Sequence, residues 1–279
     1  MLIRRSTLFA VLPALLAGMG PIEARAYIPP SEYVLKKVLQ KRLPLKNVRL
    51  RGMVAGLRPD GRSTGTRFVE ETFYDAASRT LHSSAFDETG RELYSVERNL
   101  GGGGDAGEPR ALVWATLFEA RFSNFLPLLR KWDIPVKLES ELLKLADEPE
   151  RRAVEKMHLG RQKLASGFQV SWVLGETSSN QLWIEKDSFV PSRLIFKSGD
   201  GSDLRIDEYS STKEIPTPRT MTLSRGSEQL LREEIQETTV NGAALPAFAR
   251  GRPDGFTEAG NSADREVRDL ILRYYRILR

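Results

Sequence analysis

The chain has 279 residues, of which 40% are hydrophobic and 28% charged, with a formal net charge of +5 and no cysteine. This length and apolar fraction are sufficient for one large core. The lack of cysteine excludes disulfides and thiolate metal ligands in this sequence. A small positive surplus gives little support to nucleic-acid binding, which needs a concentrated basic patch, so we expect no nucleic-acid partner.

The first 26 residues are typical of an export signal. A short positive start is followed by an apolar run from Leu8 to Ala17, and Ala24 and Ala26 form an A-x-A cleavage site. The sequence therefore predicts a cleaved signal peptide over residues 1–26 and an exported chain that begins at Tyr27.

The alternative for this segment is an uncleaved membrane anchor. Ten apolar residues span only about 15 Å as a helix, against about 30 Å of hydrocarbon core, which favours cleavage. A lipoprotein signal would need a cysteine after Leu16-Ala17-Gly18, where this chain has Met19. We therefore expect no lipid attachment and no stable membrane insertion.

A helix is predicted to begin after Pro29-Pro30, with Ser31 as its N-cap, and to end at Leu43-Pro44. Val34 and Leu35 are repeated one turn later by Val38 and Leu39, so the helix has one apolar face. The next segments are of strand length and are separated by turn residues, which predicts an antiparallel meander. These strands are expected at residues 48–57, 67–74, 81–86 and 92–99.

A glycine-rich linker, Gly101 to Gly107, precedes a predicted helical insertion at about 111–158. Helical spacing places Trp114, Leu117, Phe118 and Phe122 on one apolar face of a first helix. A second helix, with Ser123 or Asn124 as its cap, places Phe125, Leu129 and Trp132 on one face. Weaker helices are expected at residues 140–146 and 149–157, with His158 at the end of the block.

Strands return at Gly167, where Phe168, Val170 and Trp172 alternate with less apolar residues and form one apolar face. Several short segments with turns between them follow, and no βαβ rhythm is present. The chain is therefore predicted to be an α+β protein built on one large antiparallel sheet. The later strands are expected at residues 181–185, 192–196, 204–209, 219–223 and 230–239.

The C-terminal part is predicted to be a linker at 250–262 followed by an amphipathic helix at 263–279. The apolar stripe of this helix consists of Val267, Leu270, Ile271, Tyr274 and Leu278, and arginines including Arg279 occupy the remaining faces. Docking on the sheet is expected, and a role at a membrane surface or with a partner is the alternative.

The sequence contains little that suggests catalysis. His82 and His158 stand alone, without a companion at ligand spacing, so no metal site and no catalytic residues are predicted. Glu70-Glu71 and Glu233-Glu234 each place one carboxylate on either strand face, which we interpret as the ordinary pattern of solvated edges. No cofactor is expected.

The segment from Gln181 to Phe196 contains a strand, an acidic turn, Phe189, Pro191 and a returning strand. It resembles the LolA/LolB-like periplasmic lipoprotein carrier superfamily, and the order of elements from the opening helix to Leu245-Pro246-Ala247-Phe248 agrees. The resemblance implies an unclosed β-barrel over residues 27–249, an α+β fold in which a large curved antiparallel sheet has helices covering its concave face. It also implies a periplasmic location.

The resemblance further implies a hydrophobic cavity and a helical lid held by an arginine, for which Arg121 is the nearest candidate. The alternative is that the same residues are ordinary core. Truncation of a lid side chain over a partly empty cavity should remove fewer contacts than truncation of a core side chain. The predicted ligand-binding residues are Trp114, Leu117, Phe118, Phe122, Phe125, Leu129, Trp132, Phe168, Val170 and Trp172.

Two functions follow from these expectations. The first is a periplasmic carrier or binding protein for lipoprotein acyl chains or another apolar ligand, in outer-membrane lipoprotein sorting. The second is a non-enzymatic regulatory or scaffolding module of the envelope that binds a partner protein. An open, lipid-sized cavity under the helices would favour the carrier, and a barrel filled by its own side chains would favour the partner-binding module.

Overall fold

The computed structural model describes residues 28–100, 108–144, 157–164, 167–197, 201–212, 214–242 and 254–279. Four predicted features lie outside the described residues: the signal peptide at 1–26, the linker at 101–107, the fourth helix up to residue 156, and Leu245–Phe248.

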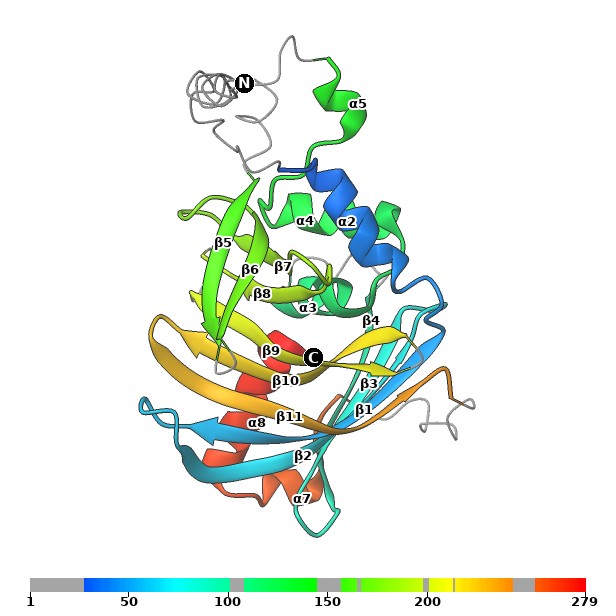
Figure 1. Cartoon of the computed structure of the whole chain (residues 1–279). Coiled ribbons are helices and arrows are strands. Elements are labelled where there is room, and N and C mark those ends of the chain that lie inside the picture. Colours follow the sequence, from blue (N-terminus) through cyan, green and yellow to red (C-terminus); the bar gives the residue numbers. More distant parts are fainter. Residues whose placement is uncertain are drawn as a thin grey trace, which may run out of the picture.

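In the described part of the chain, twelve strands form one antiparallel sheet in the order β12-β4-β3-β2-β1-β11-β10-β9-β8-β7-β6-β5. The order is linear, so the sheet curves without closing (Figure 1). The strands are β1 (Asn47–Leu57), β2 (Ser63–Asp75), β3 (Thr80–Phe86), β4 (Glu92–Asn99), β5 (Met157–Leu164), β6 (Gly167–Leu174), β7 (Gln181–Glu185), β8 (Pro191–Ile195), β9 (Ser202–Thr212), β10 (Ile215–Arg225), β11 (Glu228–Val240) and β12 (Gly255–Phe256).

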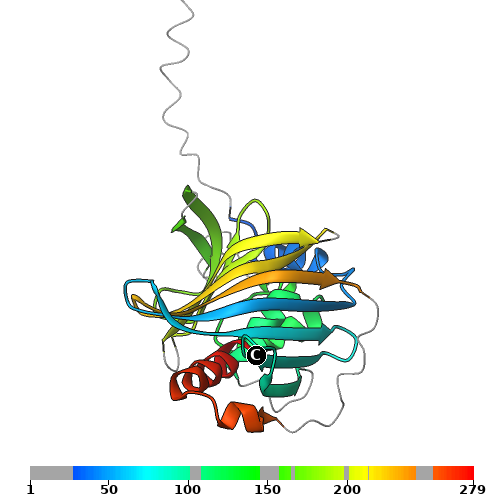
Figure 2. The same ribbon diagram turned by 90° about the horizontal axis from the view of Figure 1, so that it is seen from below.

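Helices lie against the inner side of this curved sheet, as the two perpendicular views show (Figures 1 and 2). The longest of them, α8, packs on α3 and on strand β2. The described helices are α2 (Ser31–Gln40), α3 (Pro109–Phe118), α4 (Phe122–Lys131), α5 (Glu139–Leu142), α7 (Glu258–Asn261) and α8 (Arg265–Leu278).

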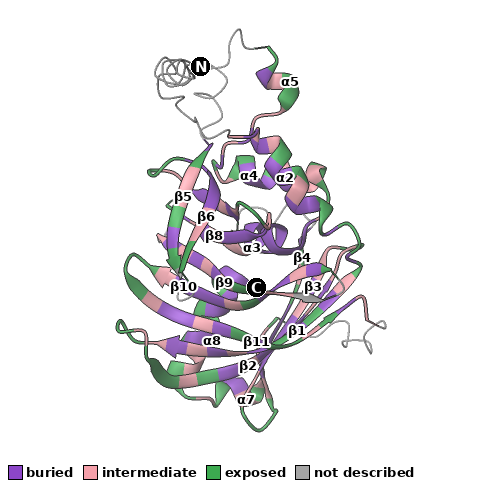
Figure 3. Cartoon of the chain, in the orientation of Figure 1, coloured by how far each residue is buried: buried purple, intermediate pink, exposed green. Residues whose placement is uncertain are grey.

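The core lies between the inner face of the sheet and the helices. In β1, the alternating residues Val48, Leu50 and Val54 are fully buried, as expected for a strand with one face on the core. In α3, every residue from Ala111 to Phe118 is buried, because the helix has the sheet on one side and α8 on another (Figure 3). The predicted α+β fold with an open antiparallel sheet is confirmed.

The predicted first helix is interrupted at Glu119. Its carboxylate accepts hydrogen bonds from the backbone N–H groups of Ala120 (3.0 Å) and Arg121 (2.8 Å), which holds the chain extended between two helices. Phe122 therefore begins α4 and does not share a helix face with Trp114, contrary to the prediction.

Two further segments differ from the prediction. His158 lies in β5, paired with Val173 of β6, and not at the end of a helix. Within the expected linker at 250–262, the described residues form β12 and α7, which pack on β4. The Thr257 hydroxyl caps α7 by accepting from the Gly260 N–H (3.1 Å), and Gly260 lies so close to the Leu93 carbonyl that no side chain would fit.

Candidate ligand-binding site

Helices α3 and α4, which we call the cover, lie over the inner face of the sheet. Aromatic side chains of α3 form a cluster there with a side chain of β2. The Trp114 and Phe118 rings stack with their centroids 4.9 Å apart, and Tyr74 of β2 lies 5.7 and 5.9 Å from them. All three side chains are nearly fully buried. The centre of the half-barrel is therefore filled by side chains in this structure.

The structure brings most of the predicted ligand-binding residues into or against this core, and separates one of them. Phe122, Trp132 and Val170 are partly buried, and Trp132 makes an edge contact with Phe196 at 5.3 Å. Phe168 is 69% exposed near the β5–β6 turn, so it does not share a buried face with Trp172 as the alternation predicted. The buried members are Trp114, Leu117, Phe118, Phe125, Leu129 and Trp172.

One arginine fastens the end of α3 to the α2 side of the fold. The fully buried Arg42 guanidinium donates hydrogen bonds to the backbone carbonyls of Ala115 (3.2 Å), Glu119 (3.3 Å) and Thr116. Burial lowers the pKa of Arg42 to about 10, which leaves it charged at neutral pH. The carbonyls at a helix C-terminus carry partial negative charge, so a cation stabilises them.

The sequence had suggested Arg121 for this role, but the Arg121 side chain is exposed. Arg42 lies within the predicted opening helix, but in the structure α2 ends at Gln40 and Arg42 is in the turn that follows it. Its position in the fold, and not a local pattern, gives it this contact.

The end of the half-barrel next to α8 contains a buried charge network, which we call the α8 network: Glu70, Glu233 and Arg279. The Arg279 guanidinium lies 2.9 Å from Glu70 and 2.6 Å from Glu233, and all three side chains have no exposed surface. The Thr72 hydroxyl accepts a hydrogen bond from Arg279 Nε, and the Ser83 hydroxyl donates one to Glu70. The guanidinium also lies 4.9 Å from the centre of the Trp114 ring.

The network perturbs the acidity of its members. Burial raises the pKa of Glu233 to about 7 and raises that of Glu70, while attraction to Arg279 opposes both shifts. Burial alone would lower the pKa of Arg279, but the attraction of Glu233 and Glu70 outweighs it and raises that pKa. Arg279 therefore stays charged at neutral pH.

The prediction that Glu70 and Glu233 lie on solvated edges is wrong, and so is the placement of Arg279 on a polar helix face. The same period-two pattern contains the signal that was missed. Glu70 lies between Phe68 and Thr72 on one strand face, and all three are buried. A carboxylate in phase with apolar neighbours is thus directed to the core.

Around the network, α8 fills its end of the half-barrel. The Tyr274 ring packs edge-on against Phe68 at 5.4 Å, and Tyr275 lies 4.7 Å from Tyr94. The Trp114 indole N–H donates to the Leu278 carbonyl at 2.6 Å, which joins α8 to α3. The predicted docking of this helix on its own sheet agrees with the structure.

At the opposite end, a hollow of about 770 Å³ opens between α2, β6 and the β7–β8 turn. We call it the α2 groove. Tyr33, Trp172 and Phe189 supply its aromatic walls, and Tyr33 remains 48% exposed. The other lining residues are Pro29, Pro30, Glu32, Lys36, Glu139 and Lys186.

The charged residues of the α2 groove differ in their contacts. Glu32 pairs with Lys36 at 2.6 Å and accepts a hydrogen bond from the Glu139 backbone N–H at 2.6 Å. The Lys186 ammonium lies 5.9 Å from the centre of the Trp172 ring, and no carboxylate of the described residues pairs with it. Size and lining agree with a small-molecule pocket.

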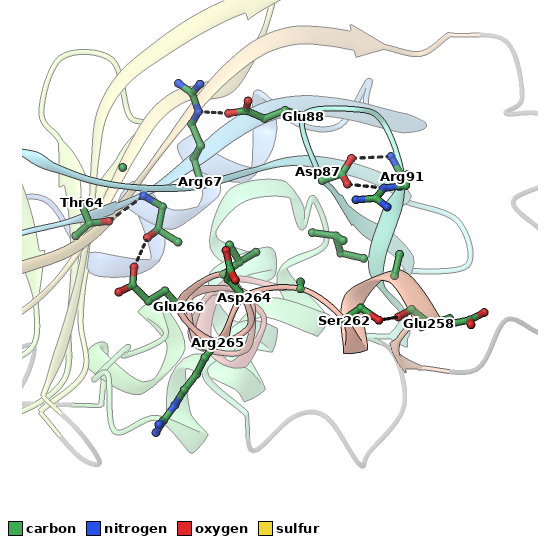
Figure 4. Close-up of a pocket in the computed structure, with 16 residues that line it drawn as sticks. Thr64, Arg67, Asp87, Glu88, Arg91, Glu258, Ser262, Asp264, Arg265 and Glu266 are labelled. Atoms are coloured by element: carbon green, nitrogen blue, oxygen red, sulfur yellow. Dashed lines mark hydrogen bonds and ion pairs between the residues drawn. The ribbon is translucent and has the colours of Figure 1, made fainter.

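A larger hollow of about 1050 Å³ lies between α7, the start of α8 and strands β2 to β4, and its lining is polar. Figure 4 shows two ion pairs in its lining, Arg67 with Glu88 at 2.5 Å and Arg91 with Asp87 at 2.8 Å. We assign no ligand to it.

Among the described residues, no group of three or more histidine, aspartate and glutamate side chains is arranged to hold a metal ion. His82 lies 3.4 Å from Glu97. No helix within the described ranges is long and apolar enough to cross a membrane.

The fold and site define an open α+β half-barrel with a helical cover, an internal charge network at one end and an aromatic groove at the other. No protein-family model matches the sequence, and no curated protein shows significant similarity to it. The chain is similar to a solved LolA superfamily protein from Nitrosomonas europaea, with 9% identity and a TM-score of 0.40 over 78% of this chain and 96% of that one.

Two further solved structures are similar at the same level of identity. A DUF1329 family protein from Desulfovibrio piger has a TM-score of 0.37 over 78% of this chain and 96% of its own, at 9% identity. A proposed outer membrane lipoprotein-sorting domain from Vibrio parahaemolyticus has a TM-score of 0.36 over 76% of this chain and 93% of its own, also at 9% identity.

Proposed function

We propose that this protein is a non-catalytic periplasmic binding protein, which takes lipoprotein acyl chains or another apolar ligand into its half-barrel. The observation that carries the proposal is the way the concave face is covered. Helices α3 and α4 cover it through side-chain contacts and not through strand pairing, and the buried guanidinium of Arg42 fastens the end of α3. Such a cover can separate from the sheet while the hydrogen bonds between the strands stay intact.

Magnitudes support displacement of the cover by a lipid. Burial of a methylene contributes about 0.8 kcal/mol, so a chain of twelve carbons gains on the order of 10 kcal/mol. A fully buried Phe or Leu side chain contributes about 1.5 to 3 kcal/mol. One acyl chain can therefore replace the contacts of three or four cover residues, such as Phe118, Phe125 and Leu129.

The test uses a dansyl-labelled fatty acid with the wild type and with Phe118→Ala and Trp132→Ala. Both truncations should weaken binding, because both side chains belong to the cover. Phe118 is almost fully buried, so its loss should lower the free energy of unfolding by about 3 to 5 kcal/mol, and half-buried Trp132 by less. A large loss of stability with unchanged probe binding would show that these residues are only core.

A second candidate is the regulatory or scaffolding module that binds a partner protein. The filled half-barrel favours it, because Trp114 and Phe118 occupy the space that a preformed lipid cavity would need. Native mass spectrometry of protein purified from envelope extracts separates the two functions. A bound lipid supports the carrier, whereas ligand-free protein with a stable protein partner supports the scaffold.

The location is part of the same proposal. Protein recovered from cells should begin at Tyr27 or within a few positions of it, as N-terminal sequencing would show. Recovery of chain with intact Met1 in a membrane fraction would contradict export by cleavage.

A further inference from the structure

We propose that the α2 groove binds the anionic head of a single-chain amphiphile, a carboxylate or a phosphate, through the Lys186 ammonium and the Trp172 indole N–H. The inference rests on the proposed function, which it deepens by naming the head-group chemistry and its site. Three observations carry it: the shape and walls of the groove, its charge distribution, and a buried donor without an acceptor.

The walls of the groove suit the first part of an acyl chain. Tyr33 and Phe189 meet edge to face with ring centroids 6.4 Å apart, and Trp172 lines the same hollow. Pro29 and Pro30 add apolar surface. The volume of about 770 Å³ lies within the range of small-molecule pockets.

The groove lining carries two ammonium groups, Lys36 and Lys186, and two carboxylates, Glu32 and Glu139. The Glu32 carboxylate is already neutralised by Lys36 and hydrogen-bonded by the Glu139 backbone, so these groups form a completed unit on one side. The exposed Lys186 ammonium contacts the Trp172 ring and pairs with no carboxylate of the described residues. The Lys186 ammonium beside the Trp172 ring is therefore available to bind a negatively charged group.

The Trp172 side chain supplies a second donor. Trp172 is only 5% exposed, and its indole nitrogen is buried without a hydrogen-bond partner among the described residues. Buried N–H groups almost always have an acceptor, and one without an acceptor lowers stability. A carboxylate or phosphate oxygen held by Lys186 would be an acceptor of the required kind.

The position of the groove agrees with a ligand that continues inward. At the other end of the half-barrel, the Arg279 guanidinium and α8 already occupy the inner face. Trp172 belongs both to the lining of the α2 groove and to the buried core under the cover. A head group at Lys186 would thus direct its chain toward α4 and α3.

The experiment measures binding by isothermal titration calorimetry with the full chain and four probes below their critical micelle concentrations. These are dodecyl phosphate, laurate, uncharged dodecyl maltoside and inorganic phosphate. The two anionic dodecyl compounds should bind at least about tenfold more tightly than the maltoside, because a charge-assisted hydrogen bond is made only with them. Inorganic phosphate should bind weakly, because it lacks the chain.

Two variants and a matched control locate the site. Lys186→Gln should remove the preference for the anionic compounds, and Trp172→Phe should weaken their binding several-fold while keeping an aromatic wall. Lys163→Gln, at an exposed lysine of β5 outside the groove, should change nothing. Thermal melting of each variant confirms that it is folded.

The outcomes separate the two proposals. Failure of every dodecyl compound to bind the wild type would overturn both the proposed function and this inference. Equal binding of charged and uncharged compounds, or an unchanged preference in Lys186→Gln, would overturn the inference alone. Inorganic phosphate that binds as tightly as dodecyl phosphate would show an anion site without an amphiphile.

Discussion

The two ends of the half-barrel differ in how their charged side chains are placed, since the charges are enclosed at one end and the Lys186 ammonium is exposed at the other. In the α8 network, Arg279 pairs with both Glu70 and Glu233, and the three side chains are fully enclosed. In the α2 groove, Lys186 and the Trp172 indole N–H have no acceptor among the described residues. The carboxylates at the α8 end are therefore paired within the protein, whereas the donors at the α2 groove are available to a ligand.

We expect this difference to distinguish polar groups that stabilise the fold from polar groups that bind a ligand. Charges that the fold satisfies internally contribute to a unique docking of α8, and breaking them should affect stability. Donors that the fold leaves unsatisfied should affect binding and leave stability nearly unchanged. Four substitutions follow, three at buried charged residues and one at an exposed apolar side chain, taken from the largest expected effect to the smallest.

The largest effect is expected for Arg279→Ala. This change leaves Glu70 and Glu233 buried without a cation, so the free energy of unfolding should fall by about 3 to 5 kcal/mol in urea denaturation. Arg276→Ala is the matched control, because Arg276 is exposed on the same helix and should shift stability by less than about 0.5 kcal/mol. Similar losses in both variants would contradict a special role for the network.

Arg42→Met should have the next largest effect. The variant keeps an apolar stem but leaves the Ala115, Thr116 and Glu119 carbonyls without their donor, which should cost about 1 to 3 kcal/mol. Hydrogen exchange should rise in α3 more than in α8. Uniform exchange throughout the core would show that Arg42 does not fasten the cover in particular.

The pH dependence of stability tests Glu233. Its pKa of about 7 in the fold exceeds its ordinary value of 4.5, so the folded state binds the proton more tightly. The contribution of this group to stability is therefore largest at low pH and is lost as pH rises from about 4.5 to about 7. Glu233→Gln should flatten this decrease, by on the order of 2 kcal/mol, as melting curves at pH 5 and pH 8 would show.

The neighbouring residue provides the control for this measurement. Glu234→Gln changes an exposed carboxylate of the same strand, so its melting temperatures should follow those of the wild type across the pH range. A decrease in stability that persists in Glu233→Gln would assign the pH dependence to other groups.

The smallest effect is expected for Phe168→Ser. Phe168 is 69% exposed and touches the Arg161 guanidinium at 5.7 Å from its ring centre, so its loss should change stability by less than about 0.5 kcal/mol. Binding of the dodecyl probes should also stay the same. Weakened binding would support the sequence-based prediction that Phe168 is a ligand-binding residue.

The strands were the most predictable part of the fold, because alternation and turn residues are local signals. The expected strand at 92–99 coincides with β4. The break between α3 and α4 was not predictable from helical spacing, because it depends on the Glu119 carboxylate, which binds the following backbone N–H groups. At Phe168 a local signal was present but misleading. The alternation predicted a buried side chain, and in the structure this side chain is 69% exposed.

The site was less predictable than the fold because its polar members lie far apart in sequence. Arg42 and the carbonyls that it contacts are more than 70 residues apart, and Arg279 and Glu70 are separated by 209. Only the alternation around Glu70 and that around Glu233 offered a local signal. The apolar members of the core followed from spacing, and six of the ten predicted ligand-binding residues are buried there.

The pairing of β1 with β11 has a consequence for how the chain folds. Strands β1 to β4 form one local meander and β5 to β11 another, and the two meanders join where Val48 lies opposite Val240. This seam has a register shift at Gly52, where a side chain would meet the Glu234 carbonyl at 2.8 Å. Loop closure over nearly 200 residues is slow. The two meanders should therefore gain hydrogen-exchange protection early in refolding, and the amides of the seam should become protected last.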